Sequence, residues 1–218
     1  MTNPPAIRSN RRGLVAPALF GTYVVWGSTD LALRYGLEDG FPPFILNGIR
    51  LVVAGGGLYV VLRARGYAAP TRRQWWNLTR IGALLMVGGL GLVTIAEDLG
   101  VGSGLAATAI AVMPLWAALF GGLFGTWPNR MEWIGLLIGF AGVAMLAQEG
   151  DFRATATGAV LVMIAPASWA FGSVWGGRLD LPGTWMTTAG ELLTGGVLLL
   201  VLAPLRGERI TEAPAASA

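Results

Sequence analysis

The sequence contains no cysteine and no histidine, and all fifteen of its basic residues are arginine. Without cysteine and histidine, the chain cannot form a disulfide, the usual zinc sites, haem ligation through histidine, or a Cys/His nucleophile–base pair. Without lysine, it can form neither a retinal Schiff base nor the phosphate-binding loop of an ATP-driven pump. We therefore expect no enzymatic activity, no cofactor and no metal site.

Charged residues are scarce as well. They make up 12% of the 218 residues, whereas 54% of the residues are hydrophobic. A soluble domain has about 25% charged residues. The 33 glycines fit helices that pack closely in lipid through small residues. The composition predicts an all-α integral membrane protein surrounded by lipid, and the small net charge of +3 does not indicate a nucleic-acid partner.

Seven apolar segments are long enough to cross a bilayer, since about 20 helical residues span its roughly 30 Å hydrocarbon core. They lie near residues 14–35, 43–62, 81–99, 104–124, 131–147, 158–176 and 184–204. The connections between them are short. We predict that residues 1–13 form a cytoplasmic N-terminal tail and residues 205–218 a mobile C-terminal tail.

The arginines indicate how the chain crosses the membrane. With the N-terminus inside, ten arginines fall in inner segments and four in outer segments, while Arg50 lies within the second span. Cytoplasmic segments of membrane proteins carry an excess of Arg and Lys. Most of the nine tryptophans flank the inner loops, and indole rings favour the membrane interface. The pattern predicts a multi-pass protein of the inner or plasma membrane with a cytoplasmic N-terminus.

The sixth span repeats features of the first. Trp169 takes the place of Trp26, and the same alignment, with a slip of two residues, brings the second span onto the seventh. Arg50 then occupies the position of Glu191. The alternative interpretation is that any two glycine-rich membrane helices look alike, but two consecutive spans match here with nearly the same offset.

The repeat predicts an inverted topology. The first unit, residues 14–147, holds five spans, and the second unit, residues 158–204, holds two. Because five is an odd number, the second unit enters from the opposite side of the membrane, as in many secondary transporters. At a constant offset, the partner of the fifth span would lie beyond Ala218, so three of ten expected spans are absent from the sequence.

Several motifs, in order along residues 14–204, resemble the EamA family of the drug/metabolite transporter superfamily. They are Trp26-Gly-Ser-Thr29, Gly36-Leu-Glu-Asp-Gly-Phe-Pro-Pro43, Gly48-Ile-Arg50, Ala96-Glu97, Ser103-Gly-Leu-Ala-Ala107, Pro114-Leu-Trp116 and Gly135-Leu-Leu-Ile-Gly-Phe-Ala-Gly-Val143. The resemblance implies a ten-helix exporter of metabolites or drugs, with two five-helix repeats around a central cavity. Asp30 stands where such proteins commonly carry an aromatic residue, which implies a different cavity chemistry.

Two functions follow from this resemblance and from the missing spans. The first is secondary transport of a small molecule, as export, by alternating access between the repeats. The alternative is a truncated, non-transporting membrane fragment, or a half-transporter that requires a partner subunit. A homodimer or a complementing subunit would supply the faces that the absent spans leave open.

Arg50 is the sharpest candidate site residue, because an arginine inside a span is costly unless it faces the interior and has a partner. We expect it to pair with Asp30 or Glu97. Three roles stay open: a buried ion pair that fixes helix register, a site for the carboxylate of a substrate, or snorkelling to the interface. The predicted substrate-binding residues are Trp26, Asp30, Arg50, Glu97, Trp116 and Trp169.

The three tryptophans of this set lie within spans and could line a path for aromatic or amphipathic solutes, although ordinary helix packing explains each of them too. Glu191 lies in the opposite half of the membrane from Arg50, where no basic residue is at its depth. A carboxyl group removed from water favours its protonated form, so Glu191 is a candidate for proton coupling. The spacings Gly121/Gly125 and Gly135/Gly139 predict close helix contacts.

Overall fold

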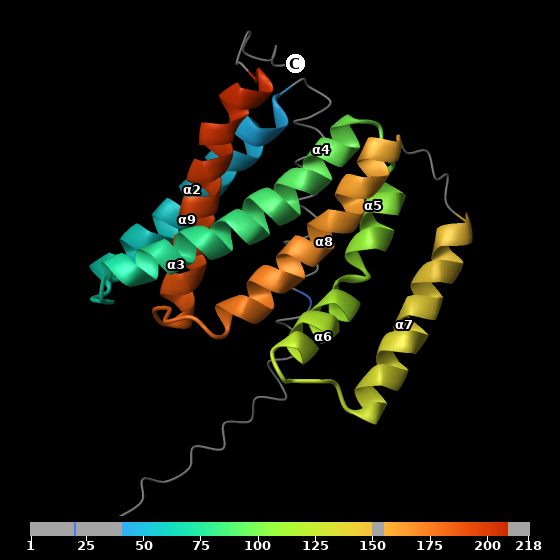
Figure 1. Cartoon of the computed structure of the whole chain (residues 1–218). Coiled ribbons are helices and arrows are strands. Elements are labelled where there is room, and N and C mark those ends of the chain that lie inside the picture. Colours follow the sequence, from blue (N-terminus) through green and yellow to red (C-terminus); the bar gives the residue numbers. More distant parts are fainter. Residues whose placement is uncertain (1–19, 21–40, 150–154, 209–218) are drawn as a thin grey trace, which may run out of the picture. The chain divides into compact units, whose positions relative to one another are not determined.

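The structure, a computed structural model, describes residue 20 and residues 41–149 and 155–208 (Figure 1). Every regular element in this part of the chain is helical. The predicted first span, with Trp26 and Asp30, lies outside the described residues apart from Phe20. The elements are α2 (Pro43–Ala64), α3 (Arg72–Gly82), the π-helix η1 (Ala83–Gly91), α4 (Leu92–Asp98), α5 (Ser103–Ile110), α6 (Met113–Leu123), α7 (Arg130–Glu149), α8 (Ala156–Gly176), α9 (Thr184–Leu202) and the 3₁₀-helix η2 (Ala203–Arg206).

Five of the described helices are long and apolar enough to cross a membrane. They are Pro43–Ala64, Arg72–Asp98, Gly104–Leu123, Ala156–Gly176 and Thr184–Arg206. The 20-residue α7 occupies the place of the predicted fifth span. The protein is therefore a multi-pass membrane bundle of helices. The count of seven spans stays a prediction, since the first predicted span is not described.

The third span begins at Arg72, well before the predicted start at residue 81. Thr71 caps this helix: its hydroxyl accepts a hydrogen bond from the backbone N–H of Gln74, and the Gln74 side chain accepts one from the backbone N–H of Thr71. This reciprocal pair is the capping box that starts many helices. The helix continues through η1 and α4 to Asp98.

The fourth span is broken between α5 and α6, as its internal proline suggests. Pro114 lies in the first turn of α6, where its missing N–H has no helical partner to lose. Pro166, by contrast, lies inside a continuous α8. The structure does not confirm the predicted contacts at Gly121/Gly125, because Gly125 adopts φ +85° and ends the turn after α6.

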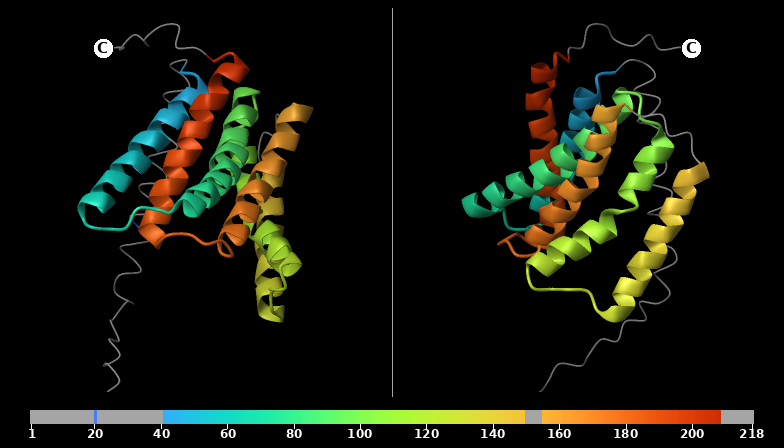
Figure 2. Two further views of the ribbon diagram at one scale, coloured as in Figure 1. Left: turned by 60° about the vertical axis from the view of Figure 1, so that its left-hand side comes forward. Right: turned by 45° about the vertical axis from the view of Figure 1, so that its right-hand side comes forward.

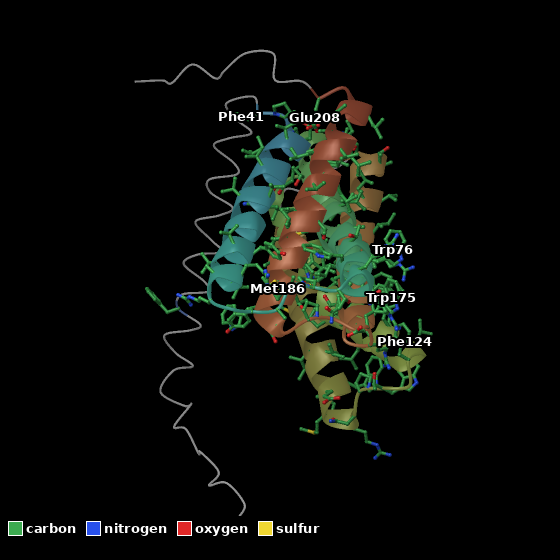
Figure 3. All side chains as sticks on the ribbon, turned by 90° about the vertical axis from the view of Figure 1, so that its left-hand side faces the viewer. Phe41, Trp76, Phe124, Trp175, Met186 and Glu208 are labelled. Atoms are coloured by element: carbon green, nitrogen blue, oxygen red, sulfur yellow. The ribbon has the colours of Figure 1, made fainter. Side chains whose placement is uncertain are left out.

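Helices α2 and α9 lie side by side and run in opposite directions (Figure 2). The start of α2 meets the end of the α9 segment, where the Glu208 carboxylate accepts hydrogen bonds from the backbone N–H groups of Phe44 (2.9 Å) and Ile45 (3.2 Å). At the other end, Leu62 packs with Met186. Figure 3 shows Met186 and Glu208 at opposite ends of α9.

Glycine allows the backbones of α2 and α9 to approach closely. A Cβ on Gly55 would lie 2.5 Å from the backbone nitrogen of Leu193 and 2.8 Å from the carbonyl oxygen of Ala189. A Cβ on Gly196 would lie 2.8 Å from the backbone nitrogen of Val52. Small residues at membrane helix interfaces permit this approach. The antiparallel pair is the arrangement that an inverted repeat requires, although the repeat itself stays a prediction.

The main core lies where α8 and α9 pack against the long third span. Leu199, Ile81 and Leu85 are 0%, 1% and 8% exposed, and they form one cluster with Phe44, Leu51, Met86 and Ala203. Helix α8 also packs against α4, α5 and α6. Helix α7 lies at the edge of the bundle, where α5 is its main neighbour among the described elements (Figure 1).

The bundle has two chemically different ends. At one end, which we call the arginine-rich end, lie the loops 65–71, 124–129 and 177–183. Asn77 of α3 donates a hydrogen bond to the carbonyl oxygen of Asp180, and Arg178 donates one to the carbonyl oxygen of Phe124. At the other end, which we call the Glu208 end, Arg206 contacts the carboxylates of Asp98 (3.4 Å) and Glu208 (3.9 Å).

The Glu208 end also differs from the sequence prediction, which placed residues 205–218 in a mobile tail. Arg206 and Glu208 contact the start of α2 and the end of α4, and the Glu208 side chain is only 8% exposed. Gly207 allows Glu208 to reach α2, because its φ of +77°, which glycine adopts readily, turns the chain back toward the start of that helix. Residues 209–218 lie outside the described part.

Candidate functional site

A buried polar network joins α2 to α4 in the half of the bundle near the Glu208 end. Asn47 is 0% exposed, and its side-chain amide donates hydrogen bonds to the carbonyl oxygen of Pro43 (3.1 Å) and the hydroxyl oxygen of Thr94 (3.3 Å). The Thr94 hydroxyl in turn donates to the carbonyl oxygen of Leu90 (2.9 Å). Buried polar groups need such partners, and this network fixes the register of the two helices.

Arg50 joins the same network. Its Nη2 donates a hydrogen bond to the Oδ1 of Asn47, one turn earlier on α2, at 3.1 Å. The side chain is half-buried. Placing a charged side chain in an apolar medium is unfavourable. An ionisable residue inside a membrane span is therefore a candidate functional residue. The predicted inward orientation of Arg50 agrees with this bond.

Glu97 lies one turn beyond Thr94 on α4, and Arg50 lies one turn beyond Asn47 on α2. The two helices run in opposite directions (Figure 1). Along the helix axes, the hydrogen bond between Asn47 and Thr94 therefore lies between Arg50 and Glu97. Glu97 is half-buried. Arg50 and Glu97 therefore lie about one turn to either side of this bond, in the same half of the bundle. Their direct pairing stays a prediction, and the alternative partner, Asp30, lies outside the described residues.

Trp169 packs against the π-helix in the middle of the third span. A Cβ on Gly89 would lie 2.6 Å from the Cε3 of Trp169, so only glycine fits there without movement. The neighbouring Ser168 donates a hydrogen bond from its hydroxyl to the carbonyl oxygen of Leu84 at 2.8 Å. π-helical turns within α-helices are frequent at functional sites. The sequence predicted neither this turn nor the role of Ser168.

Trp116 belongs to a row of aromatic side chains between α6 and α8. Its ring stacks on Phe120 (5.9 Å between centroids), and Phe120 meets Phe171 edge-on (5.3 Å). The row continues to Trp175 and Phe124, where the Arg178 guanidinium lies 4.6 Å from the Phe124 ring centroid. Within the described part of the chain, the buried Nε1 of Trp116 has no hydrogen-bond acceptor. The row therefore consists of packed aromatic rings with one buried donor that has no acceptor among the described residues.

Glu191 lies seven residues inside α9 from Thr184, at the arginine-rich end, whereas Arg50 lies seven residues inside α2 from Pro43, at the other end. The two residues are thus in opposite halves of the bundle, as predicted. Glu191 is half-buried, and no described residue forms an ion pair with it. Its carbonyl oxygen faces Gly82, where helices α3 and α9 approach closely. Proton coupling at Glu191 stays a prediction.

One cavity of about 440 Å³ lies between α5, α6 and α7. It is lined by Ala111, Val112, Pro114, Leu115, Pro128, Glu132, Gly135, Leu136, Gly139 and Phe140. None of the described site residues predicted from the sequence lines it. Gly135 and Gly139 open onto this space, and no described atom lies within 4 Å of where their Cβ atoms would be. Among the described residues, neither glycine makes the predicted helix contact.

The sequence interpretation overlooked two residues of the polar network, Asn47 and Thr94. For Asn47 a signal was present, because a polar amide stands one turn before Arg50 in an otherwise apolar run. Thr94 gave no comparable signal, since threonine in a membrane helix commonly bonds its own backbone. Only the packing of α4 on α2 shows that its hydroxyl also accepts a bond from Asn47.

Comparison with known proteins gives the same picture. The "EamA-like transporter family" matches residues 14–148. The "Uncharacterized inner membrane transporter YedA" of Escherichia coli (strain K12) is 42% identical over 200 residues, which cover 92% of this chain and 65% of YedA. The "Uncharacterized transporter YvbV" of Bacillus subtilis (strain 168) is 32% identical over 186 residues, which cover 82% of this chain and 57% of YvbV.

The chain thus spans less than two thirds of the length of these relatives. No solved structure matches it. The family match nevertheless covers more than half of the chain, and it includes α2, the third and fourth spans and nearly all of α7. The polar network of Asn47, Arg50 and Thr94 lies within this matched region. The protein therefore belongs to the EamA-like transporter family.

Proposed function

We propose that this chain takes part in secondary transport of small metabolites or drugs, as export, by alternating access. The observation that carries the proposal is the buried network in which Arg50 donates to Asn47 and Asn47 donates to Thr94. Apolar side chains at these positions could stabilise the bundle at least as well, so stability alone does not explain a buried polar network. The network also lies in the part of the chain that matches the transporter family.

In this proposal Arg50 binds an anionic group of the substrate, such as a carboxylate. A guanidinium presents several N–H donors in one plane and matches a carboxylate with paired hydrogen bonds. The aromatic row of Trp116 and Phe120 and the ring of Trp169 would stack on an apolar part of the substrate. Trp26, Asp30 and Glu97 remain further proposed contacts.

The antiparallel α2 and α9 support an alternating-access mechanism with two inverted groups of spans. Their close backbone contact makes them a rigid unit. Movement would then occur elsewhere, at the broken fourth span and at the π-helix, where regular helical hydrogen bonding is already interrupted. Glu191 is a proposed site of proton coupling. We infer transport without any enzymatic step on the substrate.

We also propose that the arginine-rich end faces the cytoplasm, since Arg and Lys gather on that side of membrane proteins. The natural absence of cysteine makes the test direct. Single cysteines at Ala68 (arginine-rich end) and Leu205 (Glu208 end), both exposed, are treated with a membrane-impermeant maleimide in intact cells. Labelling of Leu205→Cys alone supports this orientation. Labelling of Ala68→Cys alone reverses it, and labelling of both contradicts the topology.

Transport itself is tested in proteoliposomes loaded with a defined mixture of small metabolites. We expect particular anionic compounds to leave liposomes that contain the wild-type protein faster than protein-free liposomes. Arg50→Gln should abolish this difference, because the substituted amide keeps polarity but lacks the charge. Arg65→Gln, an exposed change in a loop, is the matched control. Equal loss from wild-type and protein-free liposomes would contradict the proposal.

A second candidate function is that of a half-transporter that needs another subunit or a second copy. Proteoliposomes made at increasing protein-to-lipid ratios separate the two cases. Transport per molecule that rises with this ratio indicates association of copies, whereas constant transport per molecule indicates an active monomer.

A further inference from the structure

The first turns of α3 have one buried face and one exposed face. Leu78 and Ile81 are 0% and 1% exposed and pack against the rest of the bundle. Asn77, 5% exposed, bonds to the loop after α8. The opposite face carries four exposed side chains, Arg72, Arg73, Trp76 and Arg80, which we call the α3 patch. At helical spacing these four residues share one side of the helix, and Figure 3 shows Trp76 at the edge of the bundle.

The α3 patch is purely cationic. The sequence has no acidic residue between Asp39 and Glu97. Within residues 41–149 and 155–208, no carboxylate oxygen lies within 4.0 Å of the three guanidinium groups. Asp180, at the same end of the bundle, instead accepts a hydrogen bond from Gln74 at 3.3 Å. Three arginines thus point away from the bundle without a counter-charge from its described part.

Helix length places the patch at the membrane surface. The helix Arg72–Asp98 has 27 residues, which extend about 40 Å, whereas a hydrocarbon core is about 30 Å thick. The segment near Asp98 is apolar up to Glu97, so the polar first turns extend beyond the core. Trp76 is 59% exposed, and the Arg80 guanidinium lies 4.9 Å from its ring centroid. Exposed tryptophan with arginine is typical of the interface between headgroups and hydrocarbon.

We propose that the α3 patch is a binding site for the phosphate-bearing headgroup of an anionic phospholipid. Arg72 and Arg73 bind the phosphate, because guanidinium groups match phosphate oxygens with paired hydrogen bonds. Trp76 lies at the level of the glycerol backbone, and Arg80 extends from the hydrocarbon side toward the same phosphate. An acidic protein partner fits less well, since it would leave Trp76 no apolar environment. This site is separate from the proposed transport site and does not depend on it.

The test uses the full chain in nanodiscs that contain equal amounts of phosphatidylglycerol and phosphatidylcholine with identical acyl chains. Native mass spectrometry of the released protein counts the retained molecules of each lipid. We expect the wild-type protein to retain phosphatidylglycerol preferentially. An arginine near anionic lipid contributes about five-fold in affinity, so Arg72→Gln with Arg73→Gln should lower this preference about 25-fold. High salt should lower it in the wild-type protein as well.

The matched control carries Arg65→Gln and Arg130→Gln. It loses the same charge at the same end of the bundle, from exposed positions outside the patch, and should keep the preference. Equal loss in both double variants, or no lipid preference in the wild-type protein, overturns the proposal. A docking site for an acidic protein would give the second result. Displacement of the retained lipid by soluble glycerol 3-phosphate also overturns it, because the site would then bind phosphate from any source.

Folding of the variants is checked by their melting temperatures in nanodiscs of phosphatidylcholine alone. Because the substituted side chains are exposed and lack described ion-pair partners, these temperatures should equal that of the wild-type protein. In mixed nanodiscs the wild-type protein and the Arg65/Arg130 variant should be stabilised further by binding. A stabilisation of the Arg72/Arg73 variant by the same amount contradicts the assignment.

Discussion

The close contact between α2 and α9 makes a quantitative prediction for two glycines of the same helix. Gly55 faces α9, where an added Cβ would lie 2.5 Å from the backbone nitrogen of Leu193 and 2.8 Å from the carbonyl oxygen of Ala189. Gly57 is exposed two residues later, and no atom lies within 4 Å of its added Cβ in the described structure. Gly55→Ala and Gly57→Ala therefore make the same chemical change in two different environments.

The magnitude follows from the difference between these environments. Alanine in place of glycine favours a helix by about 1 kcal/mol at either position. At Gly55 the obstructing atoms belong to the backbone of α9, so they cannot rotate away and the two helices must separate. Overpacking of this kind costs about 1–3 kcal/mol. The propensity term cancels between the two variants, so we expect Gly55→Ala to be less stable than Gly57→Ala by about 1–3 kcal/mol.

The assay is equilibrium unfolding in mixed micelles, followed by helical circular dichroism, with both variants and the wild-type protein measured together. A third variant, Gly196→Ala, would place a Cβ 2.8 Å from the backbone nitrogen of Val52 across the same interface. Once one substitution has separated the helices, the second should cost less than it does alone. Equal unfolding free energies for Gly55→Ala and Gly57→Ala would refute the close packing of α2 on α9.

Three further changes test other contacts. Glu208→Ala removes the acceptor for the first backbone N–H groups of α2 and should cost about 1 kcal/mol, with faster hydrogen exchange confined to that turn; unchanged exchange contradicts the cap. Asn47→Ala leaves the Arg50 guanidinium without its amide partner and should lower the unfolding free energy by about 1–3 kcal/mol; an unchanged value means that the network is not formed. Gly89→Ala should displace Trp169 and lower the melting temperature, whereas Gly139→Ala, which faces open space, should not; the reverse order contradicts the packing of the π-helix.

The apolar runs were sufficient to predict five of the membrane-spanning helices and the place of α7. The length and the hydropathy of a segment largely determine whether it inserts into a membrane. Arg50 could also be singled out from sequence, since a charge inside an apolar run needs an explanation. The depths of Arg50 and Glu191 followed from counting residues from the helix ends, and the structure places them in opposite halves as expected.

Other features could not be predicted from the sequence for identifiable physical reasons. The apolar segment predicted from residue 81 does not show where the helix begins, because Arg72, Arg73 and Arg80 are polar. The capping residue Thr71 marks that start. No sequence pattern distinguishes the π-helix from the α-helices on either side of it. It forms where the third span packs against α8. Which partner a buried polar residue selects, as Asn47 selects Thr94, depends on tertiary arrangement.

The carboxylate that caps α2 has a consequence for biosynthesis. Glu208 follows Phe44 by 164 residues, so the first turn of α2 is synthesised long before its acceptor exists. At translation rates of about 5–20 residues per second, this delay is on the order of ten seconds. During that interval, water or lipid headgroups must accept hydrogen bonds from these backbone N–H groups, and the carboxylate contact cannot yet hold the start of α2. The Glu208 contact can therefore fix the start of α2 only after residue 208 has been synthesised.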